Sequence, residues 1–226
     1  MLIAILFGGI TAVAQRPKTV KCTMNSVKKA MNAKSSVANS SQNTTLVVVD
    51  CQYDFIDGSL ACSGSHEAVA YLINFINRHE MEVLYTSDWH SPANRSFKVN
   101  GGIWPIHCVA GEKGSALDRH FFADIIDVKN RPNEENIFHK GMDDIVEEYS
   151  AFHGINKKGI LLGTMVTDHV YVGGIASEYC IKETVFELLK AGHKVTLLVK
   201  GLGYVDYNGH LAAIDAMKKL GVEILE

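Results

Sequence analysis

The sequence predicts an α/β protein, a three-layer α/β/α sandwich built on a doubly wound, mostly parallel sheet of about six strands. Two observations carry this prediction. From Leu46 onward, short runs of β-branched and other apolar residues alternate with longer segments whose apolar residues recur at helical spacing. The chain has 226 residues, 47% of them hydrophobic and 21% charged, which is enough for one domain with a sizeable core.

The expected strands are short apolar runs with turn residues between them. They cover residues 46–50, 82–87, near 135–139, 169–175, 194–199 and 222–225. The expected helices cover residues 65–78, near 154–164, 178–190 and 207–219. Ser65 and Glu67 give the first of these helices its start signal. The loop 88–113 is long for a connection between a strand and a helix, and such loops are commonly functional.

Residues 1–44 are interpreted as an N-terminal extension, and residues 45–226 as one α/β domain. Residues 1–14 are apolar, too short to span a bilayer, and end in an A-x-A pattern, so they resemble a signal peptide without its basic region. The remainder carries scattered lysines without periodicity, which is typical of a mobile linker. A cytoplasmic protein is expected, with export as the alternative. A natural start at Met24 or Met31 also stays open.

Charge and cysteine content exclude several classes of partner. A net charge of −3 leaves no basic surplus, so neither nucleic acid nor an acidic membrane surface is expected as a partner. A small molecule is expected instead, and a homo-oligomer is left open. The five cysteines form no CxxC pair and are odd in number, which argues against a disulfide framework and a structural zinc knuckle.

Cys180 is a candidate nucleophile. The apolar run from His169 opens into Gly-Gly-Ile-Ala-Ser-Glu-Tyr-Cys, which places Cys180 in the first turn of the helix expected at 178–190. Unpaired backbone N–H groups and the helix dipole can lower the pKa of a cysteine there. The alternative is a buried apolar cysteine, which describes most free cysteines.

Two further strand ends bear on that choice. Asp50 closes the run Leu46-Val-Val-Val, and Lys140 follows the run Asn136-Ile-Phe-His. Ligands of an open α/β sheet bind beyond the carboxyl ends of its strands, so a base, a cation and a thiol can meet at one edge. A carboxylate can take the thiol proton, and an ammonium nearby favours the thiolate. Asp54 and Asp57 fit a turn better than a site.

The long loop supplies candidate metal ligands. Asp88 and His90 lie two apart at a strand end, so their side chains share a face of an extended segment, and His107 follows 17 residues later. One carboxylate and two imidazoles suit zinc, iron or manganese. Spacing alone does not justify the third ligand, and each histidine taken singly is better explained as a surface residue.

From residue 46 to the C-terminus the chain resembles the nicotinamidases, a branch of the isochorismatase-like cysteine hydrolase superfamily. The resemblance rests on six motifs in the family's order: V-V-D-C-Q-Y-D-F, S-D-W-H, W-P-I-H-C-V, F-H-K-G, E-Y-S-A-F and G-I-A-S-E-Y-C. It implies hydrolysis of nicotinamide to nicotinic acid and ammonia. It also implies one divalent metal ion, zinc in the first place, with iron or manganese as alternatives.

Carried over residue by residue, the resemblance assigns roles to the candidate residues. Cys180 would be the nucleophile, Asp50 the proton shuttle and Lys140 the cation that holds the thiolate. The metal ligands would be Asp88, His90 and His107. The oxyanion hole would be formed by the N–H groups of Ala176 and Cys180, after a cis peptide between Ile175 and Ala176. The substrate would lie against Phe55, Trp104 and Ile175.

The sequence departs from the family's pattern at several positions. Many members carry a further metal contact after the Asp-x-His pair, often a histidine, where this chain has Asn94, Arg95 and Ser96. Ser177 stands where threonine is common and Glu178 where aspartate is usual.

Three alternatives to a nicotinamidase stay open. A related cysteine hydrolase could act on another small amide, such as a pyrazinamide-like or carbamoyl compound. A non-catalytic relative could keep the fold alone. A metal-bound hydroxide could replace Cys180 as the nucleophile.

Overall fold

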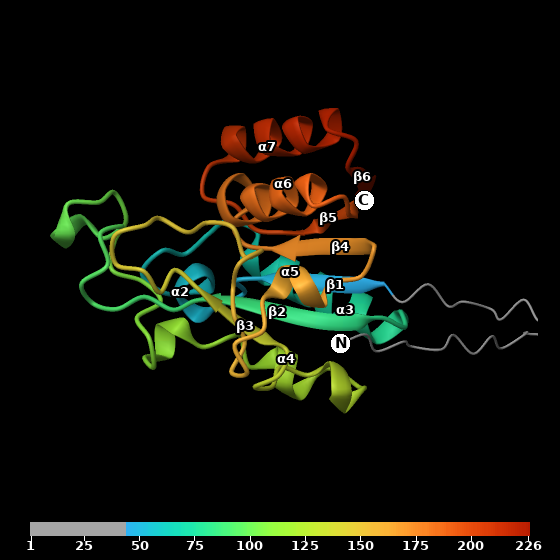
Figure 1. The fold of residues 1–226 in the computed structure, drawn as a ribbon, viewed down its shortest axis with the longest axis horizontal. Helices are drawn as coiled ribbons and strands as arrows, with labels where there is room; N and C mark the ends of the chain where they lie inside the picture. The colour runs from blue at the N-terminus through green and yellow to red at the C-terminus, as the bar shows by residue number, and fades with distance from the viewer. Residues whose placement is uncertain (1–43) are drawn as a thin grey trace, which may run out of the picture. The chain divides into compact units, whose positions relative to one another are not determined.

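A computed structural model describes residues 44–226, and its centre is a sheet of six parallel strands in the order β3-β2-β1-β4-β5-β6 (Figure 1). The strands are β1 Thr45–Val49, β2 Glu82–Asp88, β3 Ile137–Lys140, β4 His169–Gly174, β5 Lys194–Leu202 and β6 Glu223–Leu225. The strand order reverses between β1 and β4, because the chain first adds strands on one side of β1 and then on the other. The predicted doubly wound sheet is confirmed, and it is parallel throughout the described residues.

Helices cover both faces of this sheet (Figure 1). They are α2 Tyr53–Ile56, α3 Ser65–Arg78, α4 His120–Ala123, α5 Leu162–Met165, α6 Lys182–Lys190 and α7 Tyr207–Lys219. Short 3-10 helices lie at Lys98–Asn100, Lys113–Ser115 and Val128–Asn130. The four-residue helices α2 and α4 were not predicted, because so short a segment carries no measurable periodicity.

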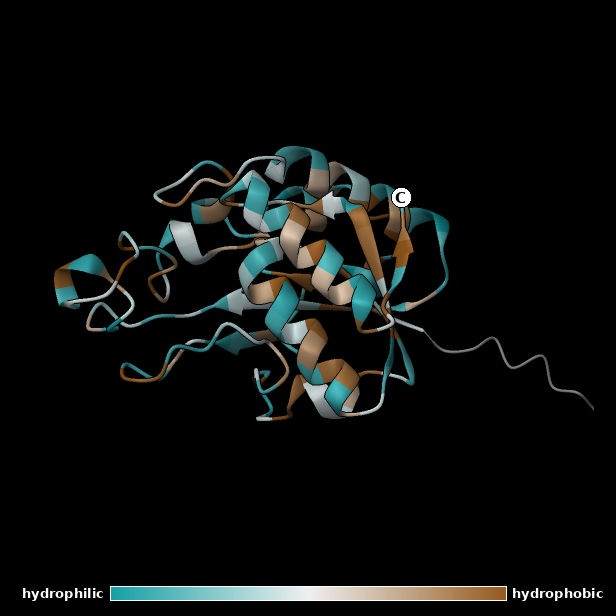
Figure 2. Ribbon diagram, turned by 90° about the horizontal axis from the view of Figure 1, so that it is seen from above, coloured by the Kyte–Doolittle hydropathy of each residue, from teal (hydrophilic) through white to brown (hydrophobic). Residues whose placement is uncertain are grey.

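Two cores flank the sheet, and β1 contributes to both. Leu46 and Val48 pack against side chains of α2, α3 and α4, whereas Val47 and Val49 pack against α5, α6 and α7. All four side chains are fully buried, as expected for the central strand of a three-layer sandwich. The helices carry both polar and apolar residues along their length, which fits their position between the sheet and solvent (Figure 2).

Helix α3 begins at the predicted residue, but its start signal was wrong. Gly64, with φ 73°, is the N-cap, and no side chain caps the helix. Ser65 is buried and does not act as a cap. The apolar face is nevertheless as expected, since Val69, Leu72 and Ile76 are buried.

The helix predicted near 154–164 is wrong over most of its length, and only α5 is helical there. Ile155 forms antiparallel bridges with both His139 and Leu161, so the segment doubles back on itself. The Asn156 side chain accepts the N–H groups of Lys158 and Ile160, a local bond that competes with helix. Gly159, with φ +73°, completes the turn.

The described residues begin just before β1. The predicted extension, with its signal-like segment, lies outside them apart from residue 44. Among the described residues, no helix is long and apolar enough to cross a membrane.

Candidate active site

Four strands deliver charged or nucleophilic residues to the same edge of the sheet. Asp50 follows β1, Asp88 ends β2 and Lys140 ends β3, while Cys180 follows β4 after a short turn. Because β1 and β4 are neighbours, Asp50 and Cys180 meet where the strand order reverses, which is where open α/β sheets bind ligands. The structure therefore brings together the three residues that the sequence placed at separate strand ends.

Lys140 is the centre of this group. Its Nζ lies 2.5 Å from Asp88 Oδ1, 3.0 Å from Asp50 Oδ2 and 3.4 Å from Cys180 Sγ. Lys140 is 2% exposed, so these contacts are shielded from water. One ammonium thus serves two carboxylates and the thiol at once.

Burial and charge set the protonation of the group. Burial opposes the charge of Lys140, but the two carboxylates raise its pKa well above the ordinary lysine value. Burial raises the pKa of Asp50 and, against the pull of Lys140, raises the pKa of Cys180 well above that of a free thiol. The predicted lowering of the Cys180 pKa is not what the structure shows, because burial, together with the charges of Asp50 and Asp88, outweighs the effect of the Lys140 ammonium. Cys180 therefore carries its proton as a thiol.

Asp50 is placed to remove that proton. Its Oδ1 accepts a hydrogen bond from the Thr86 hydroxyl at 2.6 Å, whereas its Oδ2 pairs with the Lys140 ammonium at 3.0 Å. Ligand atoms of Asp50 and Cys180 lie within 4.8 Å of each other. The backbone of Asp50 has φ +48°, and its N–H donates to Thr86, which aims the carboxylate at the thiol.

Cys180 lies in a wide turn ahead of α6. The predicted helix 178–190 divides into a π-helical turn at Ser177–Ile181 and α6 itself. The peptide between Ile175 and Ala176 is cis, as the resemblance implied. The Ala176 carbonyl accepts hydrogen bonds from the N–H groups of Tyr179 and Ile181. It accepts none from the N–H of Cys180, which lies between them in the sequence. Such π-helical turns are frequent at functional sites.

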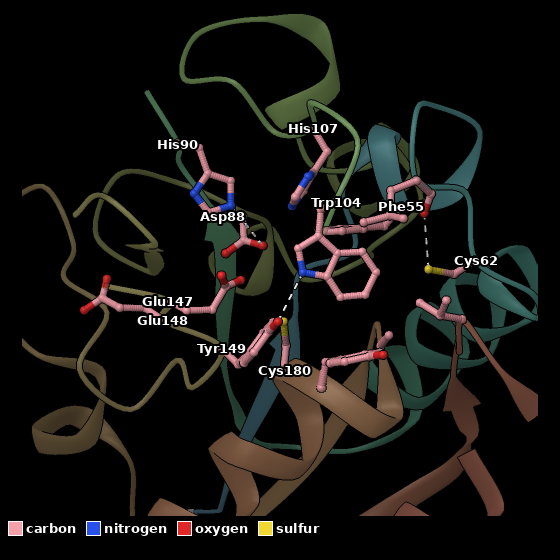
Figure 3. Close-up of a pocket in the computed structure, with 14 residues that line it drawn as sticks. Phe55, Cys62, Asp88, His90, Trp104, His107, Glu147, Glu148, Tyr149 and Cys180 are labelled. Carbon is pink, nitrogen blue, oxygen red and sulfur yellow. Dashed lines mark hydrogen bonds and ion pairs between the residues drawn. The ribbon is translucent and has the colours of Figure 1, made fainter. Parts of the chain in front are cut away.

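The three predicted metal ligands converge beside this group (Figure 3). Asp88, His90 and His107 are buried, and each offers a ligand atom within 4.8 Å of the others. The Nδ1 atoms of His90 and His107 lie 2.7 and 2.8 Å from the carbonyls of Gly141 and Pro105. A carbonyl can only accept, so both protons sit on Nδ1 and both Nε2 atoms are free to bind a metal. The residues fit a divalent metal ion.

Asn94 occupies the position of the further metal contact, but it serves the loop after β3 instead. Its amide nitrogen donates to the carbonyls of Gly141 and Asp143 at 3.3 and 3.1 Å. Its Oδ1 accepts the N–H of Ser96 at 2.9 Å. Asn94 therefore holds Gly141 beside His90. Its side chain is used in these bonds, so Asp88, His90 and His107 remain the donor set for a metal ion.

Cys180 and the three predicted metal ligands line one pocket of about 420 Å³ (Figure 3). Besides the site residues, its walls include Phe55, Cys62, Trp104, Tyr149, Tyr179 and Val205. Phe55 and Trp104 thus lie where the resemblance placed them. Ile175 does not line this pocket, because its side chain is fully buried in the core on the α3 side of the sheet.

Two tyrosines of this pocket were not singled out from the sequence. The Trp104 indole donates to the Tyr149 hydroxyl at 3.1 Å, and its ring lies edge-on to Tyr179 at 5.0 Å. Both belong to quoted motifs, E-Y-S-A-F and G-I-A-S-E-Y-C, but motif membership does not show which way a side chain points. Together the three rings form an aromatic wall of the pocket that Cys180 also lines.

Gly141→Ala is expected to destabilise the protein through His90. Gly141 has φ +66°, and a Cβ there would lie 2.4 Å from His90 Cε1. The matched control is Gly159→Ala, because Gly159 has φ +73° and nothing within 4 Å of the added Cβ. The control isolates the backbone cost of roughly 1–2 kcal/mol, and the clash should add about 1–3 kcal/mol at Gly141. The measurement is the free energy of unfolding in urea, and equal losses for the two variants would contradict this prediction.

Comparison with known proteins agrees with this geometry. Residues 44–226 match the model of the isochorismatase domain family. The nicotinamidase of Saccharomyces cerevisiae is 30% identical, over 69% of this chain and 85% of that protein. The solved pyrazinamidase of Pyrococcus horikoshii in complex with zinc superposes with a TM-score of 0.69 at 30% identity, covering 81% of this chain and 99% of that one.

A structure from L. infantum in complex with nicotinate superposes with a TM-score of 0.70 at 28% identity, covering 83% of this chain and 94% of that one. The match of the family model spans nearly all the described residues, and the similarity to the S. cerevisiae protein spans most of that protein's length. The chain therefore belongs to the isochorismatase-like superfamily, in its nicotinamidase branch, and is a hydrolase that acts on amide bonds.

Proposed function

We propose that this protein hydrolyses nicotinamide to nicotinic acid and ammonia through a thioester on Cys180. One observation carries the proposal. The Cys180 thiol lines one pocket with His90 and His107, and the Lys140 ammonium that contacts this thiol also pairs with the Asp50 carboxylate. This arrangement joins a nucleophile and its base to a site for a divalent metal ion. The nicotinamidase relatives and the nicotinate-bound neighbour support the choice of amide.

In the first half of the reaction, the Cys180 sulfur attacks the carboxamide carbon while Asp50 Oδ2 takes the thiol proton. The Lys140 ammonium stays charged and stabilises the sulfur as negative charge develops on it. The backbone N–H groups of Ala176 and Cys180 donate to the oxyanion, a contribution worth about 10²- to 10³-fold in rate per donor. Asp50 then passes its proton to the departing nitrogen, and ammonia leaves.

In the second half, water hydrolyses the thioester. Asp50 is a carboxylate again after ammonia has left, so it can accept a proton from the attacking water. The same N–H groups hold the second oxyanion, and the thiol is restored when nicotinic acid is released. Asp50 thus acts as acid and base in turn, and the Lys140 ammonium 3.0 Å from its Oδ2 stabilises its carboxylate form.

Asp88, His90 and His107 would hold the metal ion. When bound, such an ion supplies a Lewis acid that can take the ring nitrogen of the substrate and so fix its orientation. Phe55 and Trp104 would flank the ring, and burial of the site excludes water from competing with the amide. Zinc is the first candidate because a carboxylate and two imidazoles suit it, and iron or manganese would suit the same donors.

The test is ammonia release from nicotinamide, with and without bound metal. We expect turnover by the zinc-loaded protein, loss of turnover after chelation, and recovery when zinc is returned. Pyrazinamide and a carbamoyl compound should be assayed in parallel. A zinc-loaded protein that hydrolyses one of these compounds but not nicotinamide would contradict the proposal and support the other cysteine hydrolase.

A further inference from the structure

The segment that carries Asp50 also reaches the metal ligands, through two side chains that the mechanism does not use. Gln52 and Asp54 follow Asp50 at alternate positions, Gln52 as the N-cap of α2 and Asp54 in its first turn. Both contact backbone that is remote in sequence, 36 and 54 residues away. In each case that backbone belongs to, or directly follows, a proposed metal ligand.

Gln52 is fully buried and pairs with the backbone of Asp88. Its Oε1 accepts the Asp88 N–H at 2.8 Å, and its Nε2 donates to the Asp88 carbonyl at 2.9 Å. The second hydrogen of Nε2 goes to the carbonyl of Ser115 at 2.8 Å. The Gln52 side-chain amide thus pairs with the backbone at the end of β2 as a neighbouring strand would. Its orientation is set by three bonds to fixed backbone groups, so it holds the Asp88 peptide in one position.

Asp54 plays the equivalent part for His107. Its Oδ2 accepts the N–H of Cys108, the residue after His107, at 2.7 Å. Cys108 has φ +47°, a conformation that costs a residue with a side chain roughly 1–2 kcal/mol. A charge-assisted hydrogen bond offsets such a cost, because it is about twice as strong as a neutral one. The turn that aims His107 into the site is therefore held by the Asp54 carboxylate.

The same carboxylate is enclosed by the loop that it holds. A Cβ on Gly114 would lie 2.0 Å from Asp54 Oδ2, so the backbone there passes directly over the carboxylate. Only glycine fits such a close approach. This contact and the Cys108 bond make Asp54 a packed part of the metal loop. The expected turn role is also present, because Asp54 Oδ1 accepts the N–H of Ser59 at 3.3 Å.

We propose that Gln52 and Asp54 are positioning residues that raise metal affinity by holding Asp88 and His107 in place through their backbones. The inference rests on the metal site of the proposed function. One five-residue segment would then aim the general base with Asp50 and pre-arrange two metal ligands with Gln52 and Asp54. Outer residues that orient metal ligands typically change metal affinity by about 10- to 100-fold when they are removed.

The experiment measures zinc affinity, by competition with a chromophoric chelator, on metal-free protein. The variants are Asp54→Ala and Gln52→Ala, with Asp57→Ala as matched control. Asp57 is an exposed carboxylate three residues further on that pairs with His66 at the surface. We expect zinc binding about 10- to 100-fold weaker for the first two and unchanged for the control. Cobalt-loaded Asp54→Ala should also show a shifted ligand-field spectrum, since the His107 contact loosens.

A merely structural role predicts a different result. In that case Asp54→Ala and Gln52→Ala would lower the melting temperature of the metal-free protein and leave zinc affinity and the cobalt spectrum unchanged, which would overturn the inference. Asp54 is partly exposed, so Asp54→Ala should fold even if Gln52→Ala does not, and the test can then be made with Asp54→Ala. His107→Ala separates the two proposals. Loss of zinc in that variant, with full affinity in the Asp54 and Gln52 variants, would sink the positioning role alone. A wild type that binds no zinc would sink both.

Discussion

Replacing Cys180 with alanine is expected to lower nicotinamide hydrolysis by about 10⁴- to 10⁶-fold, the range seen when one member of a catalytic group is removed. The reason is that Cys180 is the thiol held against the Lys140 ammonium, whereas the other thiol of the pocket, Cys62, has Glu178 as its charged neighbour. Lys140 is 2% exposed and held as an ammonium between two carboxylates. The measurement is single-turnover ammonia release with zinc-loaded protein. Fold and zinc content should be unchanged, because the removed sulfur lies outside the three-ligand set.

Cys62→Ala is the matched control for this experiment. Cys62 is a second buried cysteine in the wall of the same pocket, and burial raises the pKa of its thiol to about 12. It contacts the Leu60 carbonyl, and no ammonium lies in its surroundings. We expect Cys62→Ala to keep most of the activity and to retain inactivation by a thiol-alkylating reagent. A Cys180→Ala protein as active as the parent would point to metal-bound hydroxide as the nucleophile.

Lys140→Met is expected to lower the free energy of unfolding by about 3–5 kcal/mol as well as to abolish activity. Methionine approximates the length of the lysine but leaves two buried carboxylates, Asp50 and Asp88, without their cation. Breaking a buried ion group costs this much because the remaining charge stays desolvated. Urea unfolding at neutral pH is the measurement. Adding Asp50→Asn should recover part of the loss, since it removes one of the uncompensated charges.

The pH dependence of this loss has a definite sign. Without Lys140, the two buried carboxylates lose the cation that opposes the burial effect on their pKa, so their folded-state pKa rises above the unfolded value. A group of that kind stabilises below its unfolded pKa and loses this contribution as pH rises. The gap between variant and wild type should therefore narrow toward acidic pH. A loss that is constant with pH would show that packing, and not charge, is responsible.

Lys219→Met serves as the control for a lost lysine. Lys219 pairs with Asp215 one helical turn away on the exposed face of α7, and its side chain is 74% exposed. Exposed pairs are screened by solvent and contribute little. We expect no more than a small change in unfolding, which separates the burial of Lys140 from the general effect of deleting an ammonium.

The accuracy of the fold prediction varies with the strength of the local pattern. The helices 65–78 and 207–219 were placed at their observed bounds, because a long amphipathic pattern has one way to bury its apolar face. The helix near 154–164 was wrong, since Asn156 and Gly159 form a turn that overrides a modest apolar pattern. Cap residues were also missed at α3, where Gly64 takes the place expected of Ser65.

The site divides in the same way. The strand ends identified Asp50, Lys140 and Cys180, because parallel strands present their carboxyl ends to one edge. Two features depended on tertiary contacts. The pKa of Cys180 is raised and not lowered, because burial and two carboxylates act on it together. Asp54 accepts the Ser59 N–H in its own turn, as the sequence suggested, but its bond to the turn after His107 depends on the fold.

By itself, the amino-acid sequence determined the doubly wound sheet, the family and the residues that carry chemistry, because these depend on local periodicity, strand order and motifs. Only the tertiary structure decided how the residues act on one another. Asp50, Asp88 and Lys140 are far apart in the sequence but share one buried space. The balance of their charges there sets where the protons lie. The spacing of residues along the sequence does not give the distance between strand ends in space. The meeting of His107 with Asp88, and the bond by which Asp54 holds the turn after His107, could therefore be seen only in the folded chain.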